Sequence, residues 1–86
     1  MKIRFHKEVK KRYEKLTKKE QEKTRRKLEL FLENPFDPRL NNHPLRGRYT
    51  DYRSINITGD IRAVYKFISE KECIFVIVGR HSNLYS

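Results

Sequence analysis

The sequence predicts a single α+β domain over residues 1–86, in which a helical hairpin packs on one face of a small twisted antiparallel sheet. Two observations lead to this fold class. Residues 7–33 are densely charged and carry apolar side chains at helical spacing, whereas residues 52–78 form three apolar or alternating segments separated by short polar turns. A chain of 86 residues suffices for one core made of two layers. The expected element order is β-α-α-β-β-β.

Residues 1–5 alternate apolar and basic side chains, which predicts a short edge strand. In residues 7–16, Val9, Tyr13 and Leu16 recur at spacings of four and three residues. Such spacing places the three side chains along one side of a helix whose other sides are charged. We therefore expect a strand followed by a first amphipathic helix.

A second helix is predicted over residues 18–33. Thr17 and Glu20 have the spacing of a capping box, in which each side chain accepts a hydrogen bond from the backbone amide of the other residue. The helix is expected to end at Asn34, because the residue before a proline disfavours helical geometry. The two helices, joined at Thr17, would form the hairpin.

The second half of the chain predicts a sheet. Residues 35–50 contain three prolines and are expected to form a connecting loop. Strands are predicted over residues 52–57, 61–68 and 73–78, with a tight turn at residues 58–60 between the first two. Three consecutive antiparallel strands make a meander, to which the N-terminal strand can add.

The strand that follows Asp60 has two different faces. Its first set of alternating side chains is apolar and is expected to pack against the helices: Ile61, Ala63, Tyr65 and Phe67. Its second set places two basic side chains on the other face of the sheet: Arg62, Val64, Lys66 and Ile68. A sheet that is covered on one side and basic on the other is suited to nucleic-acid binding.

The charge of the chain indicates a polyanionic partner. There are 21 Lys and Arg residues against 11 Asp and Glu residues, which gives a net charge of +10 with neutral histidines. RNA, DNA, an anionic membrane and an acidic protein are all partners of this kind. The alternative is that lysine-rich helices serve only solubility.

Several classes of protein are disfavoured. Cys73 is the only cysteine, so an internal disulfide and a cysteine-ligated zinc site are excluded. The N-terminal residues lack the apolar region of a signal peptide, and no apolar run approaches the about 20 residues that span a membrane. We expect a cytoplasmic protein without a membrane partner.

The last eight residues collect polar groups at a strand end. Residues 73–78 are the most apolar run of the chain, and Arg80, His81 and Tyr85 follow it closely. Polar side chains held at the end of a buried strand have a catalytic or binding role more often than a purely structural one.

Three segments resemble the RelE/ParE toxin superfamily, most closely its YafQ branch. They are residues 42–47 with the sequence NHPLRG, residues 51–66 with the sequence DYRSINITGDIRAVYK, and residues 78–85 with the sequence VGRHSNLY. The resemblance implies a RelE-like fold and the toxin of a type II toxin–antitoxin pair, which is held in check by a cognate antitoxin.

The resemblance also implies an activity. Members of the YafQ branch are ribosome-dependent endoribonucleases that cut mRNA in the A site without a metal or other cofactor. The RNA 2′-hydroxyl attacks the adjacent phosphate and leaves a 2′,3′-cyclic phosphate and a free 5′-hydroxyl. This reaction needs a base, cations for the phosphorane charge, and an acid for the leaving oxygen.

The catalytic roles implied by the resemblance fall on six residues. His81 takes the position of the general acid, and imidazole can donate a proton near neutral pH. His43 and Asp60 match family positions that would supply the base or orient a histidine. The alternative, non-catalytic roles are a hydrogen bond within the loop for His43 and formation of the turn for Asp60. Tyr85 matches an aromatic position suited to stacking on a base or supporting the acid, or else it covers the core.

A further position departs from the family pattern. Asn56 stands where the YafQ pattern has another catalytic histidine, and asparagine cannot exchange a proton at neutral pH. Either His43 or Asp60 supplies the base, or the chain is a weakened or inactivated version, natural or engineered.

Arginines and one lysine are the expected phosphate ligands. Arg62 falls where RelE-like toxins place a phosphate-stabilising arginine, and its alternative is an ordinary sheet-surface residue. The remaining RNA-binding candidates are Arg46, Arg48, Arg53, Lys66 and Arg80.

Two other functions remain open. A ParE-like toxin of the same fold would inhibit DNA gyrase by binding, without cutting RNA. A non-toxic nucleic-acid-binding relative is also compatible with Asn56. The histidines His43 and His81 favour the ribonuclease, since a protein that only binds has no need of an acid at the strand end.

Overall fold

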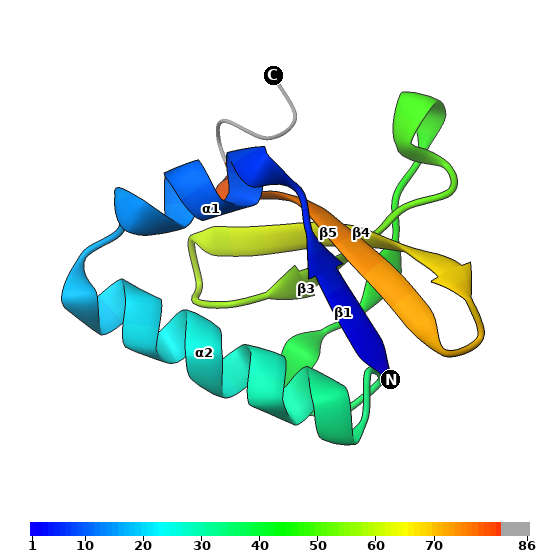
Figure 1. Ribbon diagram of the computed structural model, residues 1–86, viewed down its shortest axis with the longest axis horizontal. Coiled ribbons are helices and arrows are strands. Elements are labelled where there is room, and N and C mark those ends of the chain that lie inside the picture. The colour runs from blue at the N-terminus through cyan, green and yellow to red at the C-terminus, as the bar shows by residue number, and fades with distance from the viewer. Residues whose placement is uncertain (82–86) are drawn as a thin grey trace.

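The computed structural model describes residues 1–81, and within them two helices pack against one face of a five-stranded mixed sheet (Figure 1). The elements are β1 (Lys2–Phe5), α1 (Lys7–Glu14), α2 (Lys18–Glu33), β2 (His43–Pro44), β3 (Arg53–Asn56), β4 (Ile61–Ser69) and β5 (Glu72–Arg80), with 3₁₀ turns at Pro38–Leu40 and Gly47–Tyr49. The predicted order β-α-α-β-β-β is confirmed, with one short strand, β2, added in the connecting loop.

The strand order in the sheet is β1-β5-β4-β3-β2. The predicted meander is confirmed, because β3, β4 and β5 pair antiparallel in sequence order. The prediction of an antiparallel sheet is wrong for one pair, since β1 runs parallel to β5. Apolar alternation identifies a strand but carries no information on the direction of its partner.

The helix boundaries follow from local hydrogen bonds. At the start of α2, the Glu20 amide donates to Thr17 Oγ1 over 3.1 Å, and the Thr17 amide donates to Glu20 Oε1 over 3.0 Å. The predicted capping box is therefore confirmed, and α2 ends at Glu33 as expected. Helix α1 is shorter than predicted, because the amides of Lys15 and Leu16 turn back to the carbonyls of Arg12 and Tyr13.

Aromatic rings form the centre of the core between the helices and the sheet. The Phe31 ring from α2 meets the Tyr65 ring edge-on at a centroid distance of 4.9 Å, and the Phe75 ring at 5.3 Å. All three side chains are buried. Edge-to-face contacts of this kind add to the stabilisation that comes from buried apolar area.

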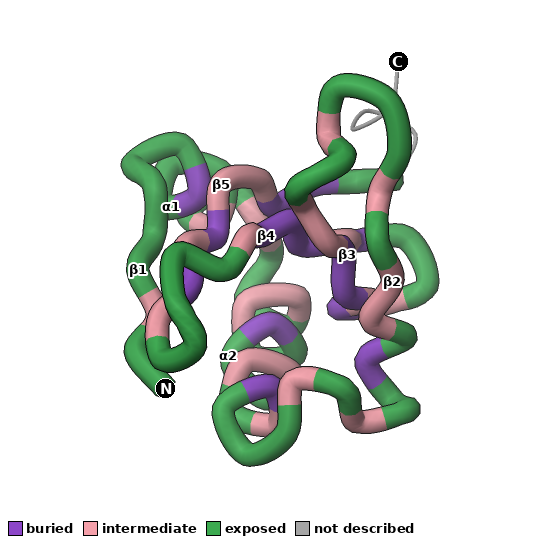
Figure 2. Tube along the Cα trace, turned by 90° about the vertical axis from the view of Figure 1, so that its right-hand side faces the viewer, coloured by how far each residue is buried: buried purple, intermediate pink, exposed green. Residues whose placement is uncertain are grey.

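The two faces of β4 differ from the prediction at two residues. Ile61, Ala63 and Tyr65 are buried against the helices as expected, but Phe67 is 40% exposed. On the second face Val64 is 1% exposed, between its register partners Ser54 and Ile77. Figure 2 shows that buried segments run along β3, β4 and β5, whereas the outer turns of the helices are exposed. The sheet face away from the helices, called the open face below, is thus closed at its centre.

Candidate active site

A row of three residues crosses one end of the open face. Asn56 of β3 is in register with Arg62 of β4, which is in register with Gly79 of β5. Side chains of directly opposed residues lie on the same face of a sheet. The row presents an amide and a guanidinium next to Gly79, which has no side chain and is buried.

His81 follows this row at the end of β5. It is exposed, and its amide donates a 2.7 Å hydrogen bond to the carbonyl oxygen of Asp60. Pairing with the β3–β4 turn therefore continues one residue past the end of the strand. His81 therefore lies just beyond β5, beside the turn that joins β3 to β4.

Arg80 points instead to the helix layer and is held by two carboxylates. Its Nη1 donates to Asp60 Oδ2 over 2.8 Å, and its Nη2 donates to Glu20 Oε2 over 3.0 Å. The bonds to Asp60 and Glu20 raise the pKa of Arg80. The backbone bond from Thr17, followed by the bond from Arg80, lowers the pKa of Glu20. Asp60, Arg80 and Glu20 are called the clasp below.

The contacts within the clasp affect the roles predicted for two of its residues. Asp60, a candidate base, uses a carboxylate oxygen to accept from Arg80. Arg80, a candidate phosphate ligand, directs both terminal nitrogens to carboxylates. Both roles stay predictions, but these contacts favour a positioning function for the pair.

Arg62 lies over the turn between β3 and β4. Its Nη1 donates to the carbonyl oxygens of Thr58 at 2.8 Å and Gly59 at 3.0 Å. These contacts, and a longer one of 3.4 Å to the Ile61 carbonyl oxygen, all use Nη1, so no hydrogen bond within residues 1–81 engages the Nε and Nη2 edge of the guanidinium. That edge has the fork geometry that binds two phosphate oxygens.

His43 reaches the open face from the short strand β2. It is in register with Ser54, which lies two residues before Asn56 on the same face of β3. The His43 Nδ1 atom is 2.8 Å from the carbonyl oxygen of Asn41. A neutral ring that donates from Nδ1 carries its lone pair on Nε2, which is the form a general base requires.

Two buried polar atoms of β3 have no hydrogen-bond partner within residues 1–81. They are the Asn56 Oδ1 and the Ser54 Oγ. Buried polar atoms are nearly always paired, so an orphan in such a place calls for an explanation. Both residues belong to the face of β3 that points away from the helices, and Ser54 is fully buried there. Ser54 was not predicted as a site residue, because no spacing pattern in the sequence identifies a buried hydroxyl that lacks a hydrogen-bond partner.

Arg53 belongs to a different environment. Its Nε donates to Asn42 Oδ1 over 2.7 Å, and its guanidinium lies 5.2 Å from the centroid of the Phe36 ring. Asn42 in turn donates to the Tyr65 hydroxyl over 2.6 Å. Arg53 is in register with Tyr65, whose side chain lies in the core, so the structure does not bring Arg53 to the row of Asn56 and Arg62.

The other predicted RNA ligands are distributed more widely. Lys66 is on the open face, where its Nζ lies 5.4 Å from the centroid of the Tyr52 ring. It is four residues along β4 from Arg62, or about 13 Å in an extended strand. Arg46 and Arg48 are exposed at the 3₁₀ turn before β3. Tyr85 lies outside the described residues.

Outside this site, Cys73 is the one thiol of the chain. Burial raises the pKa of the Cys73 thiol to about 11. Within residues 1–81, no three His, Cys, Asp or Glu side chains gather as metal ligands. The helices in this range are also too short or too polar to cross a bilayer.

Comparison with known proteins identifies a family that matches this chain. The family model described as "Bacterial toxin of type II toxin-antitoxin system, YafQ" matches residues 1–86. No curated protein sequence matches the chain significantly.

Solved structures of toxins share the fold. YafQ from E. coli strain BL21(DE3) is 24% identical with a TM-score of 0.78, and the match covers 98% of this chain and 97% of that one. The YoeB/ParE toxin from Agrobacterium tumefaciens is 22% identical with a TM-score of 0.80, over 94% and 99% of the two chains. The toxin in the E. coli DinJ–YafQ toxin–antitoxin complex is 25% identical with a TM-score of 0.75, over 98% and 96%.

Proposed function

This chain belongs to the YafQ family of bacterial toxins of type II toxin–antitoxin systems, and from that membership we propose that it cuts mRNA on the ribosome. The observation that carries the proposal is the row of Asn56, Arg62 and Gly79, which ends at His81. It combines a cation, Arg62, with an exposed imidazole, His81, on a basic protein. Cleavage by an RNA 2′-hydroxyl requires a cation for the phosphorane charge and an acid for the leaving oxygen.

In the proposed reaction the scissile phosphate lies on the open face beside Arg62. The Nε and Nη2 edge of Arg62 stabilises the negative charge that develops on the phosphorane oxygens. His81 donates a proton to the leaving 5′-oxygen. The products are a 2′,3′-cyclic phosphate and a 5′-hydroxyl, so the atoms balance without water or a cofactor.

The general base is assigned to His43. Its Nδ1 is oriented by the Asn41 carbonyl oxygen, and the resulting tautomer leaves Nε2 to accept the proton of the 2′-hydroxyl. Asp60 is less suited to this role because its carboxylate accepts from Arg80.

Asn56 is assigned a binding role. Its Oδ1, which has no hydrogen-bond partner within residues 1–81, can accept a hydrogen bond from the attacking hydroxyl or from a base amine, but it cannot take up the proton. The chain is therefore proposed to be active but slower than a variant with histidine at this position.

Antitoxin, ribosome and mRNA are the proposed partners, in the cytoplasm. The solved complex of a 25% identical toxin with the antitoxin DinJ supports the first of them. The net charge of +10 supports binding to ribosomal RNA, with the strong salt dependence that phosphate contacts produce.

The activity is tested in a translation extract that contains one defined mRNA. Cleavage at A-site codons by the wild type, and its loss in His81→Ala, would support the proposal. Lys19→Ala, an exposed change on α2, is the control and should cut like the wild type. Inhibition of gyrase supercoiling without any RNA cut would overturn the proposal in favour of a ParE-like toxin.

A further inference from the structure

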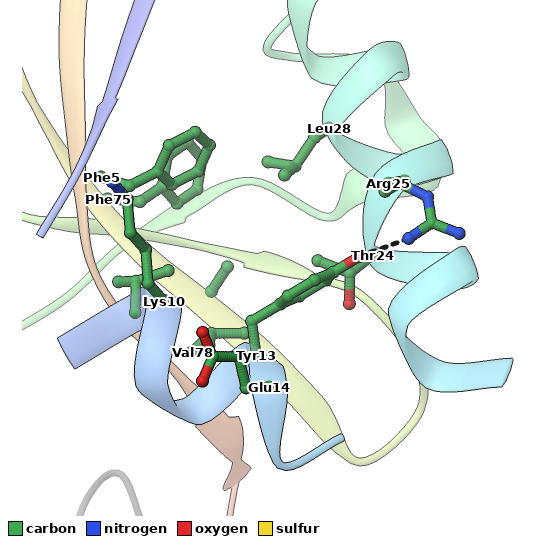
Figure 3. Close-up of a pocket in the computed structure, with 11 residues that line it drawn as sticks. Phe5, Lys10, Tyr13, Glu14, Thr24, Arg25, Leu28, Phe75 and Val78 are labelled. Carbon is green, nitrogen blue, oxygen red and sulfur yellow. Dashed lines mark hydrogen bonds between the residues drawn. The ribbon is translucent and has the colours of Figure 1, made fainter. Parts of the chain in front are cut away.

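Cavities on the two faces of the sheet differ in their chemistry. The pocket between the helices and the core face has a mainly apolar lining, with side chains such as Phe5, Leu28 and Val78 (Figure 3). A cleft of about 780 Å³ lies where β3 begins and β4 ends, and Tyr52 and Lys66 are among the residues that line it. An aromatic ring beside a basic group is the combination with which proteins bind single-stranded nucleic acids.

Tyr52 and Lys66 are neighbours on the open face. Lys66 is in register with Ile74 of β5, which also lines the cleft, and Tyr52 directly precedes β3. The Lys66 Nζ lies 5.4 Å from the centroid of the Tyr52 ring. No carboxylate within residues 1–81 pairs with this ammonium group. Its charge is therefore available to a phosphate.

Other side chains of the cleft suit a nucleobase. Phe67 is 40% exposed and Ile68 is 50% exposed, and adjacent exposed apolar groups are typical of a binding surface. Asp51 also lines the cleft, and no hydrogen bond or ion pair within residues 1–81 engages its carboxylate. A carboxylate repels phosphate but accepts a hydrogen bond from a base amine. The cleft thus offers a place for a base and, at Lys66, a place for a phosphate.

The proposed catalytic groups determine the direction of an RNA strand on this face. Arg62 is assigned to the scissile phosphate, and His43 to the attacking 2′-hydroxyl of the nucleotide on its 5′ side. His43 is in register with Ser54, which lies between Asn56 and Tyr52 along the chain. From Arg62, the RNA would therefore run in its 5′ direction past His43 toward Tyr52.

We propose that the cleft binds the nucleobase that precedes the nucleotide with the attacking hydroxyl, by stacking on Tyr52, while Lys66 binds the adjoining phosphate. Lys66 is about 13 Å from Arg62 along β4, which is farther than one nucleotide spans. The inference rests on the proposed ribonuclease activity and adds a nucleotide-binding position to that site. Because every base has an aromatic face, the cleft should accept different bases.

The first test removes the ring and the base separately. Tyr52→Ala should lower kcat/KM for ribosome-bound mRNA about tenfold, and Tyr52→Phe, which keeps the ring, should recover most of this loss. An abasic ribonucleotide at the preceding position should slow the wild type by a similar factor but slow Tyr52→Ala little further, since both changes remove the same contact. An abasic nucleotide on the 3′ side of the cut is the control and should affect both proteins equally.

The second test measures binding without cleavage. The probe is a short 2′-O-methyl oligoribonucleotide that contains one 2-aminopurine, a fluorescent base whose emission is quenched by stacking. At low salt, the wild type and Tyr52→Phe should quench it, whereas Tyr52→Ala should not. Lys66→Gln, which does not depend on the folding of Tyr52→Ala, should weaken binding about fivefold. Lys19→Gln makes the same change of net charge at an exposed position on α2 and should weaken it less than about twofold.

Three outcomes would contradict parts of the account. Equal sensitivity of the wild type and Tyr52→Ala to the preceding abasic nucleotide would overturn the base position, and so would equal quenching by the two proteins. Equal losses of binding for Lys66→Gln and Lys19→Gln would overturn the phosphate contact, because they would show only a general charge effect. Quenching that requires Tyr52, in a protein that cuts no mRNA, would support the cleft and contradict the proposed activity alone.

Discussion

Arg80 and Glu20 form an ion pair between the end of the last strand and the first turn of α2, with Nη2 and Oε2 at 3.0 Å. The same guanidinium holds Asp60, whose carbonyl oxygen accepts from the His81 amide. The helical hairpin is thus connected to the residue proposed as the general acid. Precise placement of a catalytic group depends on such supporting contacts.

Glu20→Gln separates two roles for Arg80. If Arg80 holds the strand end in place, loss of the ion pair should lower kcat about threefold to tenfold with little change in KM. If Arg80 binds phosphate, its release from Glu20 should leave cleavage unchanged or increase it. Glutamine retains the capping function, so the helix start is preserved. Glu22→Gln, which loses only the pair with Arg26, is the matched control.

The clasp should weaken in acid. Because its folded-state pKa is lowered, Glu20 contributes stability at pH values above its unfolded pKa near 4.5. That contribution is lost as the pH falls through the folded-state pKa. The difference in melting temperature between the wild type and Glu20→Gln should therefore shrink between about pH 6 and about pH 3. A difference that stays constant over this range would show that ionisation of Glu20 does not stabilise the fold.

Phe31 should dominate the contribution of α2 to stability. It is fully buried against Tyr65 and Phe75, so Phe31→Ala should lower the free energy of unfolding by about 3–5 kcal/mol. The adjacent Leu32 is 48% exposed, and Leu32→Ala should cost less than about 1 kcal/mol. Urea titration of both variants measures the difference, and comparable losses would mean that the two side chains are equally buried.

Cys73 should be unreactive in the folded protein. It is buried, and burial raises its pKa to about 11, so very little thiolate is present at neutral pH. A thiol reagent should modify the native chain slowly and the urea-unfolded chain at once. Rapid modification of the native protein would indicate that β5 opens readily.

The fold was predictable because its strongest signals are local. The Thr17 and Glu20 capping box and the apolar alternation of β4 are visible within a few residues. The parallel pairing of β1 with β5 was not predictable, since it joins residues about 70 positions apart. The exposure of Phe67 depends on where the helix layer stops covering the sheet, which no local pattern shows.

The sequence predicted which residues form the candidate site better than it predicted the contacts that they make. The resemblance identified His43, Asn56 and Arg62, and the structure brings them to one face. The resemblance gave no indication that the guanidinium groups of Arg80 and Arg53 contact other side chains of the protein. Such pairs form between distant residues, so they appear only once the sheet and helices are assembled.

The most direct test uses purified ribosomes that hold one mRNA with a single 2′-deoxynucleotide at the A-site position of cleavage. The wild type is expected to cut the all-ribose mRNA and leave a 2′,3′-cyclic phosphate, with no cut in the 2′-deoxy mRNA. His81→Ala should be slower by about 10²–10⁴-fold, the range for loss of a general acid, and Asn56→His should be faster than the wild type. Failure of both the wild type and Asn56→His to cut the all-ribose mRNA would contradict the account.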